Sequence, residues 1–342
     1  MTILVTGAAG FIGAAVSEAL LRRGEQLVGI DNLNDYYDVE LKNARLKRLS
    51  CHPEFKFVQL DISDRQDVSE LFHNSAFDIV VNLAAQAGVR YSMENPSAYV
   101  DANLVGFGNI LEGCRHGEIT HLVYASSSSV YGVSDAPDVT EEHPLVPLTL
   151  YNKFKGMCEP LLKKYTDSAF TGVIFRPATV CGYGPRQRLD VSVNILTNHA
   201  INKGKITVFG GSQLRPNLHI QDYCDLCQLL LEAPAEKIQN EIFNCGVENM
   251  SIMEIAQTVK RVVEEEFPDI NDLEIVTTPT DDIRSYHINS DKITRVLGFK
   301  PTHTVEDAIR DLCTAFRNSK LPSSFDDDIY FNVRRLKRIN AG

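Results

Sequence analysis

The chain opens with a short apolar strand that runs into a glycine-rich turn and then into a helix. The turn reads Gly7-Ala8-Ala9-Gly10-Phe11-Ile12-Gly13, with a glycine at every third position. Glycines allow the backbone to turn sharply and approach a ligand, and the free N–H groups that begin a helix attract an anion. A strand, a G-x-x-G-x-x-G turn and a helix in this order predict a unit that binds the pyrophosphate of a dinucleotide. We expect this ligand to contact Gly7, Gly10, Phe11, Ile12 and Gly13.

Short apolar runs alternate with segments of helical periodicity through the first half of the chain. The predicted strands cover 3–6, 26–30, 55–59, 79–83, 121–125 and 173–175, and the predicted helices cover 11–23, 68–72, 98–115 and 151–165. This alternation is typical of right-handed βαβ units on a parallel sheet. We therefore predict an α/β protein with a Rossmann-type doubly wound parallel sheet, covered by helices on both faces.

A carboxylate stands where the second strand ends, and another follows the third strand. Asp31 can accept hydrogen bonds from the ribose hydroxyls of adenosine and repel a 2′-phosphate, and no Lys or Arg occurs in Asn32-Leu33-Asn34-Asp35 to hold such a phosphate. The predicted cofactor is therefore NAD rather than NADP. We expect Asn32 beside the ribose and Asp61-Ile62 beside the adenine.

The sequence pattern changes after Pro177 into loops rich in glycine and proline, with short helices and strands between them. We expect a dinucleotide-binding domain over residues 1–177 and a smaller, irregular α/β substrate lobe over 178–342. Strand-like runs at 206–209 and 241–245 predict that the chain returns to the first domain around 214–246.

Composition excludes several classes of protein. The 342 residues carry 34 Lys and Arg against 45 Asp and Glu, a net charge of −11, and no basic run marks a nucleic-acid partner. No apolar stretch approaches the length of a membrane span, and the first residues lack the basic start of a signal peptide. The eight cysteines suit reduced thiols in the cytoplasm. Cys224 and Cys227 have metal-like spacing but no second pair, so we expect them to pack in the core and predict no metal site.

The fifth strand leads into Ser126-Ser127-Ser128-Ser129, and Tyr151 and Lys155 follow on a predicted helix. Residues four apart share a helix face, so both side chains can point at one bound ring. A neighbouring ammonium favours the phenolate, and we expect Lys155 to lower the pKa of Tyr151 until it is a usable base. A hydroxyl across the cleft can share the proton.

In order, these motifs resemble the extended short-chain dehydrogenases/reductases that act on nucleotide sugars, and the similarity covers nearly the whole chain. The strings Asp31-Asn32-Leu33-Asn34-Asp35-Tyr36-Tyr37 and Asn82-Leu83-Ala84-Ala85-Gln86-Ala87-Gly88-Val89-Arg90-Tyr91-Ser92 resemble those of NAD-dependent UDP-glucuronate 4-epimerases. The resemblance implies that Ser127, Tyr151 and Lys155 are catalytic. In such enzymes the tyrosine removes the proton of the sugar 4-OH while hydride leaves C4 for the nicotinamide. The resulting 4-ketose turns over and receives the hydride on its other face.

The resemblance also implies a set of binding residues. The expected cofactor contacts extend to Leu83, Ala84, Ala85, Tyr151 and Lys155. Those for the nucleotide sugar, with UDP as the favoured nucleotide, are Val89, Arg90, Ser128, Ser129, Thr179, Arg188, Phe209, Arg215 and Arg284, of which Thr179 and Arg188 would face a sugar carboxylate. The segment between these two is about two residues longer than in UDP-glucuronate epimerases, and Phe154 replaces a small residue. We expect a homodimer through the helices near 98–115 and 151–165.

Related activities are distinguished at two positions. Nucleotide-sugar 4,6-dehydratases carry Asp-Glu directly after the catalytic hydroxyl residue, and UDP-glucuronate decarboxylases usually carry Glu at the position of Ser129. Here Ser128 and Ser129 stand there, and neither hydroxyl can replace a carboxyl group in acid–base work. We therefore expect interconversion of UDP-glucuronate and UDP-galacturonate. An epimerase for another carbon or for a neutral hexose or heptose remains an alternative, as does a non-catalytic NAD-binding sensor, which would not need the catalytic residues.

Overall fold

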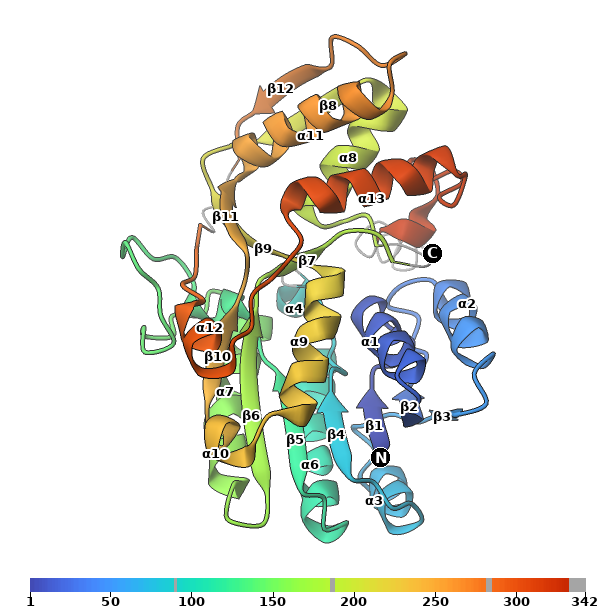
Figure 1. Cartoon of the computed structure of the whole chain (residues 1–342), viewed down its shortest axis with the longest axis vertical. Helices are drawn as coiled ribbons and strands as arrows, with labels where there is room; N and C mark the ends of the chain where they lie inside the picture. The colour runs from blue at the N-terminus through green and yellow to red at the C-terminus, as the bar shows by residue number, and fades with distance from the viewer. Residues whose placement is uncertain (89–90, 185–187, 281–284, 332–342) are drawn as a thin grey trace.

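A seven-stranded parallel sheet forms the centre of the lower part of the molecule in Figure 1, a computed structural model. The structure describes residues 1–88, 91–184, 188–280 and 285–331. The strand order is β10-β6-β5-β4-β1-β2-β3. The strands are β1 (Thr2–Thr6), β2 (Gln26–Asp31), β3 (Phe55–Gln59), β4 (Ile79–Asn82), β5 (His121–Ala125), β6 (Thr171–Pro177) and β10 (Ile242–Cys245).

The strand order reverses beside β1. The chain adds β2 and β3 on one side of β1 and then returns to place β4 on the other side. The connections that follow β1 and β4 therefore lead to opposite faces of the sheet, and ligands of doubly wound sheets bind in the crevice between such connections. Thr6, at the end of β1, stabilises the wall of this crevice. Its hydroxyl donates to Asn82 Oδ1 at 2.7 Å and accepts from the backbone N–H of Ala84 at 2.9 Å.

Helices cover both faces of this sheet. On one face lie α1 (Phe11–Arg22), α2 (Val39–Leu49) and α9 (Ile220–Glu232), and on the other lie α3 (Arg65–His73), α6 (Gly106–His116) and α7 (Leu150–Tyr165). Successive side chains of a strand point to opposite faces, so Ile3 and Val5 enter one core while Leu4 enters the other. The predicted doubly wound α/β fold is confirmed.

The shorter helices connect this frame. They are α4 (Tyr91–Glu94), α5 (Pro96–Val100), the π-helix η1 (Asp101–Val105), the 3₁₀ helix η2 (Ser128–Tyr131), α10 (Ala235–Ile238) and α12 (Asp291–Leu297). The helix predicted over 98–115 is thus three consecutive segments, α5, η1 and α6. Helix α2 was not predicted, because buried Lys42 and Arg45 interrupt its apolar face.

The upper part of Figure 1 has its own sheets and core. Its elements are β7 (Thr179–Cys181), β9 (Leu214–His219) and β11 (Glu248–Ser251) in one sheet, β8 (Lys205–Phe209) and β12 (Glu274–Thr278) in another, with α8 (Ser192–Lys203), α11 (Ile252–Glu266), α13 (Val305–Arg317) and η3 (Asp328–Tyr330). The strand predicted near 241–245 does return to the large sheet, as β10 beside β6. The prediction that residues 206–209 also return to the large sheet is wrong. These residues form β8, which pairs with β12, because Ile206 and Val208 pack into the core of the upper part.

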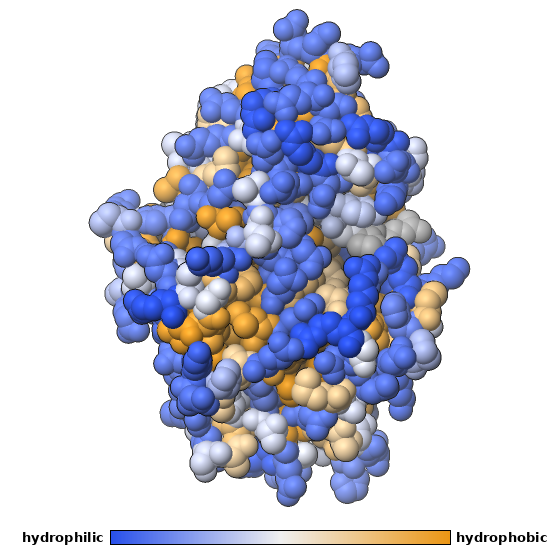
Figure 2. All heavy atoms as spheres, in the orientation of Figure 1, coloured by the Kyte–Doolittle hydropathy of each residue, from blue (hydrophilic) through white to orange (hydrophobic). Residues whose placement is uncertain are grey.

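The outer surface over α11 and α13 is largely hydrophilic (Figure 2). Charges of both signs alternate on it, and Arg310 pairs with Glu265 and Glu266 at 2.7 Å each. Such a pattern is typical of a solvated helix face. No helix among the described residues is long and apolar enough to cross a membrane.

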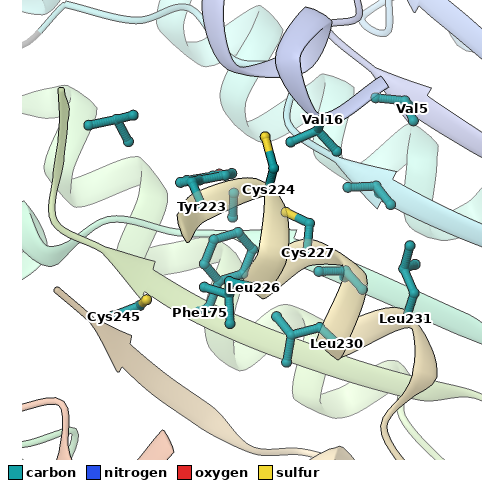
Figure 3. Close-up of a cluster of buried hydrophobic side chains, with 14 of the residues drawn as sticks. Val5, Val16, Phe175, Tyr223, Cys224, Leu226, Cys227, Leu230, Leu231 and Cys245 are labelled. Carbon is teal, nitrogen blue, oxygen red and sulfur yellow. The ribbon is translucent and has the colours of Figure 1, made fainter. Parts of the chain in front are cut away.

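The two cysteines with metal-like spacing lie in the core (Figure 3). Cys224 and Cys227 project from α9 among apolar side chains such as Leu230 and Phe175. Burial raises the pKa of Cys224 to about 12 and also holds the pKa of Cys227 well above its usual range, so both thiols stay protonated. Within the described ranges, no three His, Cys, Asp or Glu side chains are grouped so that they could hold a metal ion.

Candidate active site

A cleft of about 1100 Å³ lies at the carboxyl edge of the large sheet, between it and the upper part of the molecule. All the predicted site residues that the structure describes line it: Gly7, Gly10, Phe11, Ile12, Gly13, Asp31, Asn32, Asp61, Ile62, Leu83, Ala84, Ala85, Ser127, Ser128, Ser129, Tyr151, Lys155, Thr179, Arg188, Phe209 and Arg215. Val89, Arg90 and Arg284 lie outside the described residues. Side chains from both ends of the sequence therefore face one cavity.

The glycine turn forms a backbone cradle at one end of the cleft. Gly7 has a φ of +72°, and a Cβ there would lie 3.0 Å from backbone atoms of Ala84. A Cβ on Gly13 would lie 2.0 Å from the Gly7 carbonyl oxygen, so neither position accommodates a side chain. Gly10, which caps α1, offers no side chain to its N–H groups. These groups and the helix dipole fit a pyrophosphate.

Polar side chains surround the expected adenosine position. Asp31 Oδ1 accepts from the N–H of Leu33 at 2.9 Å, and Asn32 Nδ2 donates to Asp61 Oδ2 at 2.8 Å. Burial alone would raise the pKa of Asp61, but hydrogen bonds from Asn32 and Ser63 lower it overall. Asp61 therefore stays ionised and able to accept a hydrogen bond.

Helix α2 adds cations that the sequence prediction missed. Lys42 Nζ lies 3.3 Å from Asp31 Oδ1 and 3.0 Å from Asn34 Oδ1, and both charged side chains of the pair are buried. Burial lowers the pKa of Lys42, while Asp31 opposes that effect. Arg45 also lines the cleft and donates to the carbonyl of Ala9 at 3.0 Å. The cap at Asp38 and the apolar positions of α2 were the available signal for this helix.

The two residues predicted to act as base and support lie on the first turns of α7. Tyr151 and Ser127, the second residue after β5, line the cleft together, and Ser127 lies within reach of the phenol. Burial raises the pKa of Tyr151 to about 12 and lowers that of Lys155 to about 8. Ionisation of Tyr151 therefore needs a favourable positive charge in the cleft.

Arg188 supplies the strongest positive influence on Tyr151, opposing the effect of burial on its pKa. The sequence predicted this role for Lys155. In the structure the Lys155 ammonium instead donates to the carbonyl of Ala125 at 2.7 Å and lies 5.0 Å from the centre of the Tyr124 ring. Lys155 thus fixes the end of β5 against α7.

A buried ion pair supports this end of the cleft. Glu159, one turn beyond Lys155, accepts from Arg176 Nη2 at 2.6 Å and from the Ser126 hydroxyl at 2.6 Å. Arg176 also donates to the Tyr131 hydroxyl at 2.7 Å. The network joins β5, η2, α7 and β6 around the backbone that presents Ser127.

The other end of the cleft carries the groups expected to meet a sugar nucleotide. Arg188 Nε donates to Asp190 at 2.6 Å, so the longer segment still brings this arginine into the cleft with Thr179. Phe209 is 58% exposed at the mouth. Arg215 lies 5.7 Å from the centre of the Tyr286 ring, which the sequence prediction did not include.

Comparison with known proteins gives consistent matches. Residues 3–246 match the model of the NAD dependent epimerase/dehydratase family. UDP-glucuronate 4-epimerase 4 of Arabidopsis thaliana is 36% identical, covering 91% of this chain and 74% of that protein. UDP-glucuronate 4-epimerase of Thermodesulfobacterium geofontis is 33% identical, covering 90% and 93%. The crystal structure of UDP-glucuronic acid 4-epimerase from Bacillus cereus, in complex with UDP-glucuronic acid and NAD, superposes with a TM-score of 0.81 at 29% identity, covering 93% of this chain and 100% of that one.

Proposed function

Because the chain belongs to the NAD-dependent epimerase/dehydratase family, we propose that it is an NAD-dependent 4-epimerase that interconverts UDP-glucuronate and UDP-galacturonate. The observation that carries this proposal is the single cleft that joins the glycine cradle, the pair Tyr151 and Ser127, and the arginine Arg188. A pyrophosphate, a reacting sugar hydroxyl and a sugar carboxylate each find a chemical partner there.

The chain's own residues divide the work between binding and proton transfer. When bound, NAD supplies a reversible acceptor for the hydride of C4. Tyr151 accepts the proton of the sugar 4-OH and later returns it, while Arg188 favours the ionised tyrosine. Lys155 holds the end of β5 so that Ser127 and Tyr151 stay in contact. Thr179 and Arg188 offer a hydroxyl and a guanidinium to the carboxylate.

Two alternatives lead to different results. A neutral sugar offers no carboxylate to the Arg188 guanidinium, which would then serve only the ionisation of Tyr151, whereas a uronate uses both properties of this arginine. A non-catalytic NAD sensor would not need the hydroxyl pair of Ser127 and Tyr151. The uronate epimerase therefore explains more of the cleft than either alternative.

The direct test is a reaction without added cofactor. We expect purified protein mixed with UDP-glucuronate to form UDP-galacturonate, because an epimerase regenerates its NAD in every cycle. NMR of the anomeric protons measures the conversion. UDP-glucose is the matched neutral substrate. Conversion of UDP-glucose without conversion of UDP-glucuronate would contradict the proposal and support an epimerase for a neutral sugar. No conversion of any UDP-sugar would support a non-catalytic NAD sensor.

Cofactor preference is a prediction centred on Asp31. We expect NAD to bind more tightly than NADP, because the carboxylate repels a 2′-phosphate. In Asp31→Ala, Lys42 loses its carboxylate partner and can meet that phosphate, which should narrow the preference about 10- to 100-fold, the scale of one charge-assisted hydrogen bond. Calorimetric titration of both dinucleotides measures the change. Exposed Asp35, which acts on Lys42 more weakly than Asp31 does, is the control, and Asp35→Ala should change the preference much less than Asp31→Ala; an unchanged preference in Asp31→Ala would contradict the assignment.

A homodimer is the assembly that we propose. Apolar side chains are exposed on helices that contact one another: Met93, Val100, Val105, Met157 and Leu161 lie on α4, α5, η1 and α7. An exposed apolar patch of this kind is typical of a protein interface. We expect light scattering to give twice the chain mass and Leu161→Glu to reduce it. A monomeric wild type would contradict the proposal.

The remaining expectations concern organisation and location. We assign residues 1–177, with the return around 214–246, to NAD binding and 178–342 mainly to the nucleotide sugar. The position of β10 beside β6 supports that return. We place the protein in the cytoplasm, supported by eight free cysteines of which seven are buried.

A further inference from the structure

Three polar side chains, those of Ser127, Ser129 and Asn152, form a hydrogen-bonded chain beside Tyr151. Ser127 lines the cleft with Tyr151, and its hydroxyl oxygen lies 2.7 Å from Ser129 Oγ. Ser129 Oγ in turn lies 2.8 Å from Asn152 Oδ1. Ser129 and Asn152 are both buried, so the chain is shielded from water.

The chemistry of these groups fixes the direction of each hydrogen bond. An amide oxygen only accepts, so Ser129 donates its one hydrogen to Asn152. Ser127 must therefore donate its own hydrogen to Ser129. Ser127 also accepts from the N–H of Ser129 at 3.2 Å, so only a lone pair of its oxygen is left to face Tyr151. The serine thus has no hydrogen left for the tyrosine.

We propose that Asn152 and Ser129 are positioning residues that hold Ser127 as a hydrogen-bond acceptor facing Tyr151. This inference deepens the proposed function and rests on it. It assigns to Asn152, which the sequence prediction did not include, the setting of proton direction at the catalytic pair. Asn152 follows Tyr151 on α7, and its amide oxygen is the last acceptor in the series of hydrogen bonds that begins at Ser127.

The assigned direction has a consequence for the reaction. When Tyr151 loses its proton, Ser127 does not turn its hydrogen to the phenolate, because that hydrogen is committed to Ser129. The Ser127 lone pair that Tyr151 leaves can accept from a sugar hydroxyl instead. Ser127 then orients the sugar, and Tyr151 alone exchanges the proton.

Other charged and titratable groups around Tyr151 do not belong to this chain. Arg188 and Tyr286 act on it from the substrate side, and Tyr99 contacts its ring edge-on from α5. The buried phenols of Tyr124 and Tyr223 also interact with Tyr151, Tyr223 from the lining of the cleft, and Lys155 is held by the carbonyl of Ala125. Substitution of Ser129 or Asn152 leaves all of these groups in place.

The test compares Ser129→Ala and Asn152→Ala in the holoenzyme. Either change releases the Ser127 hydrogen, which can then stabilise the phenolate. We expect the acidic limb of the kcat–pH profile with UDP-glucuronate to move to lower pH, its apparent pKa falling by about 1, the scale of one hydrogen bond to a charged group. The double variant should move no further than either single variant, because the chain is already broken. Asn152→Ala in a Ser127→Ala background should cause no additional movement.

Ser128→Ala is the matched control, since it removes a neighbouring buried hydroxyl that is not part of the chain of Ser127, Ser129 and Asn152. We expect it to leave the apparent pKa in place whatever it does to KM. An active enzyme whose two variants keep the wild-type profile, or whose shifts add in the double variant, would overturn the proposal. An inactive wild type would instead overturn the proposed function, so the two failures are distinguishable.

Discussion

Tyr151→Phe is expected to lower kcat for UDP-glucuronate by about two to four orders of magnitude, the usual contribution of general acid–base catalysis. The substitution removes only the hydroxyl that Tyr151 presents beside Ser127 in the cleft. The ring remains, so folding and NAD binding should persist. Steady-state kinetics measures the loss, and thermal melting with and without NAD checks that the variant is folded and loaded.

A second phenol on the same helix provides the control. Tyr165 lies in the last turn of α7, hydrogen-bonds to Glu112 and is not part of the cleft. Tyr165→Phe therefore removes a hydroxyl without touching the reaction, and we expect wild-type turnover. Near-normal activity in Tyr151→Phe would remove Tyr151 from the mechanism. Ser127→Ala should cost less than Tyr151→Phe, because the tyrosine can still reach the sugar hydroxyl.

Arg188→Ala is the second large effect. If Arg188 meets the sugar carboxylate, its loss should cost about 2 to 4 kcal/mol of transition-state binding, the scale of charge-assisted hydrogen bonds. We expect kcat/KM to fall strongly for UDP-glucuronate and to fall less for any residual activity on UDP-glucose. Part of the loss should affect both sugars and diminish at higher pH, because Arg188 also opposes the effect of burial on Tyr151.

Arg188→Lys separates these two contributions. Lysine keeps the positive charge near Tyr151 but lacks the planar fork that matches a carboxylate. We expect this variant to retain the pH profile of the wild type while still discriminating less between acidic and neutral sugars. Equal losses on both sugars in Arg188→Ala, at every pH, would assign Arg188 to the diphosphate or to its loop, where it pairs with Asp190.

The sequence alone predicted those features that depend on neighbouring residues or on regular spacing. The glycine turn, the alternating strands and helices, and the Tyr-x3-Lys spacing are local, since a helix turn or a βαβ unit repeats over a few residues. They were sufficient for the doubly wound sheet and for the glycine turn, Asp31, Tyr151 and Lys155 in the cleft, whereas the contacts expected for the nucleotide sugar came from the resemblance to a known family. The sequence did not predict helix α2, because Lys42 and Arg45 lie on its buried face and no local sequence pattern indicates that a cation is buried.

Only the tertiary structure decided which side chains act on one another. Lys42 meets Asp31 because α2 folds back over the end of β2, and Arg188 reaches Tyr151 from a segment of the chain far along the sequence. The direction of the hydrogen bonds from Ser127 to Asn152 depends on which atom of each side chain faces the next. Pattern and spacing specify neither distance nor orientation between distant segments. The packing of the two cores against the sheet fixes these distances and orientations. It thereby sets the charges and proton positions in the cleft.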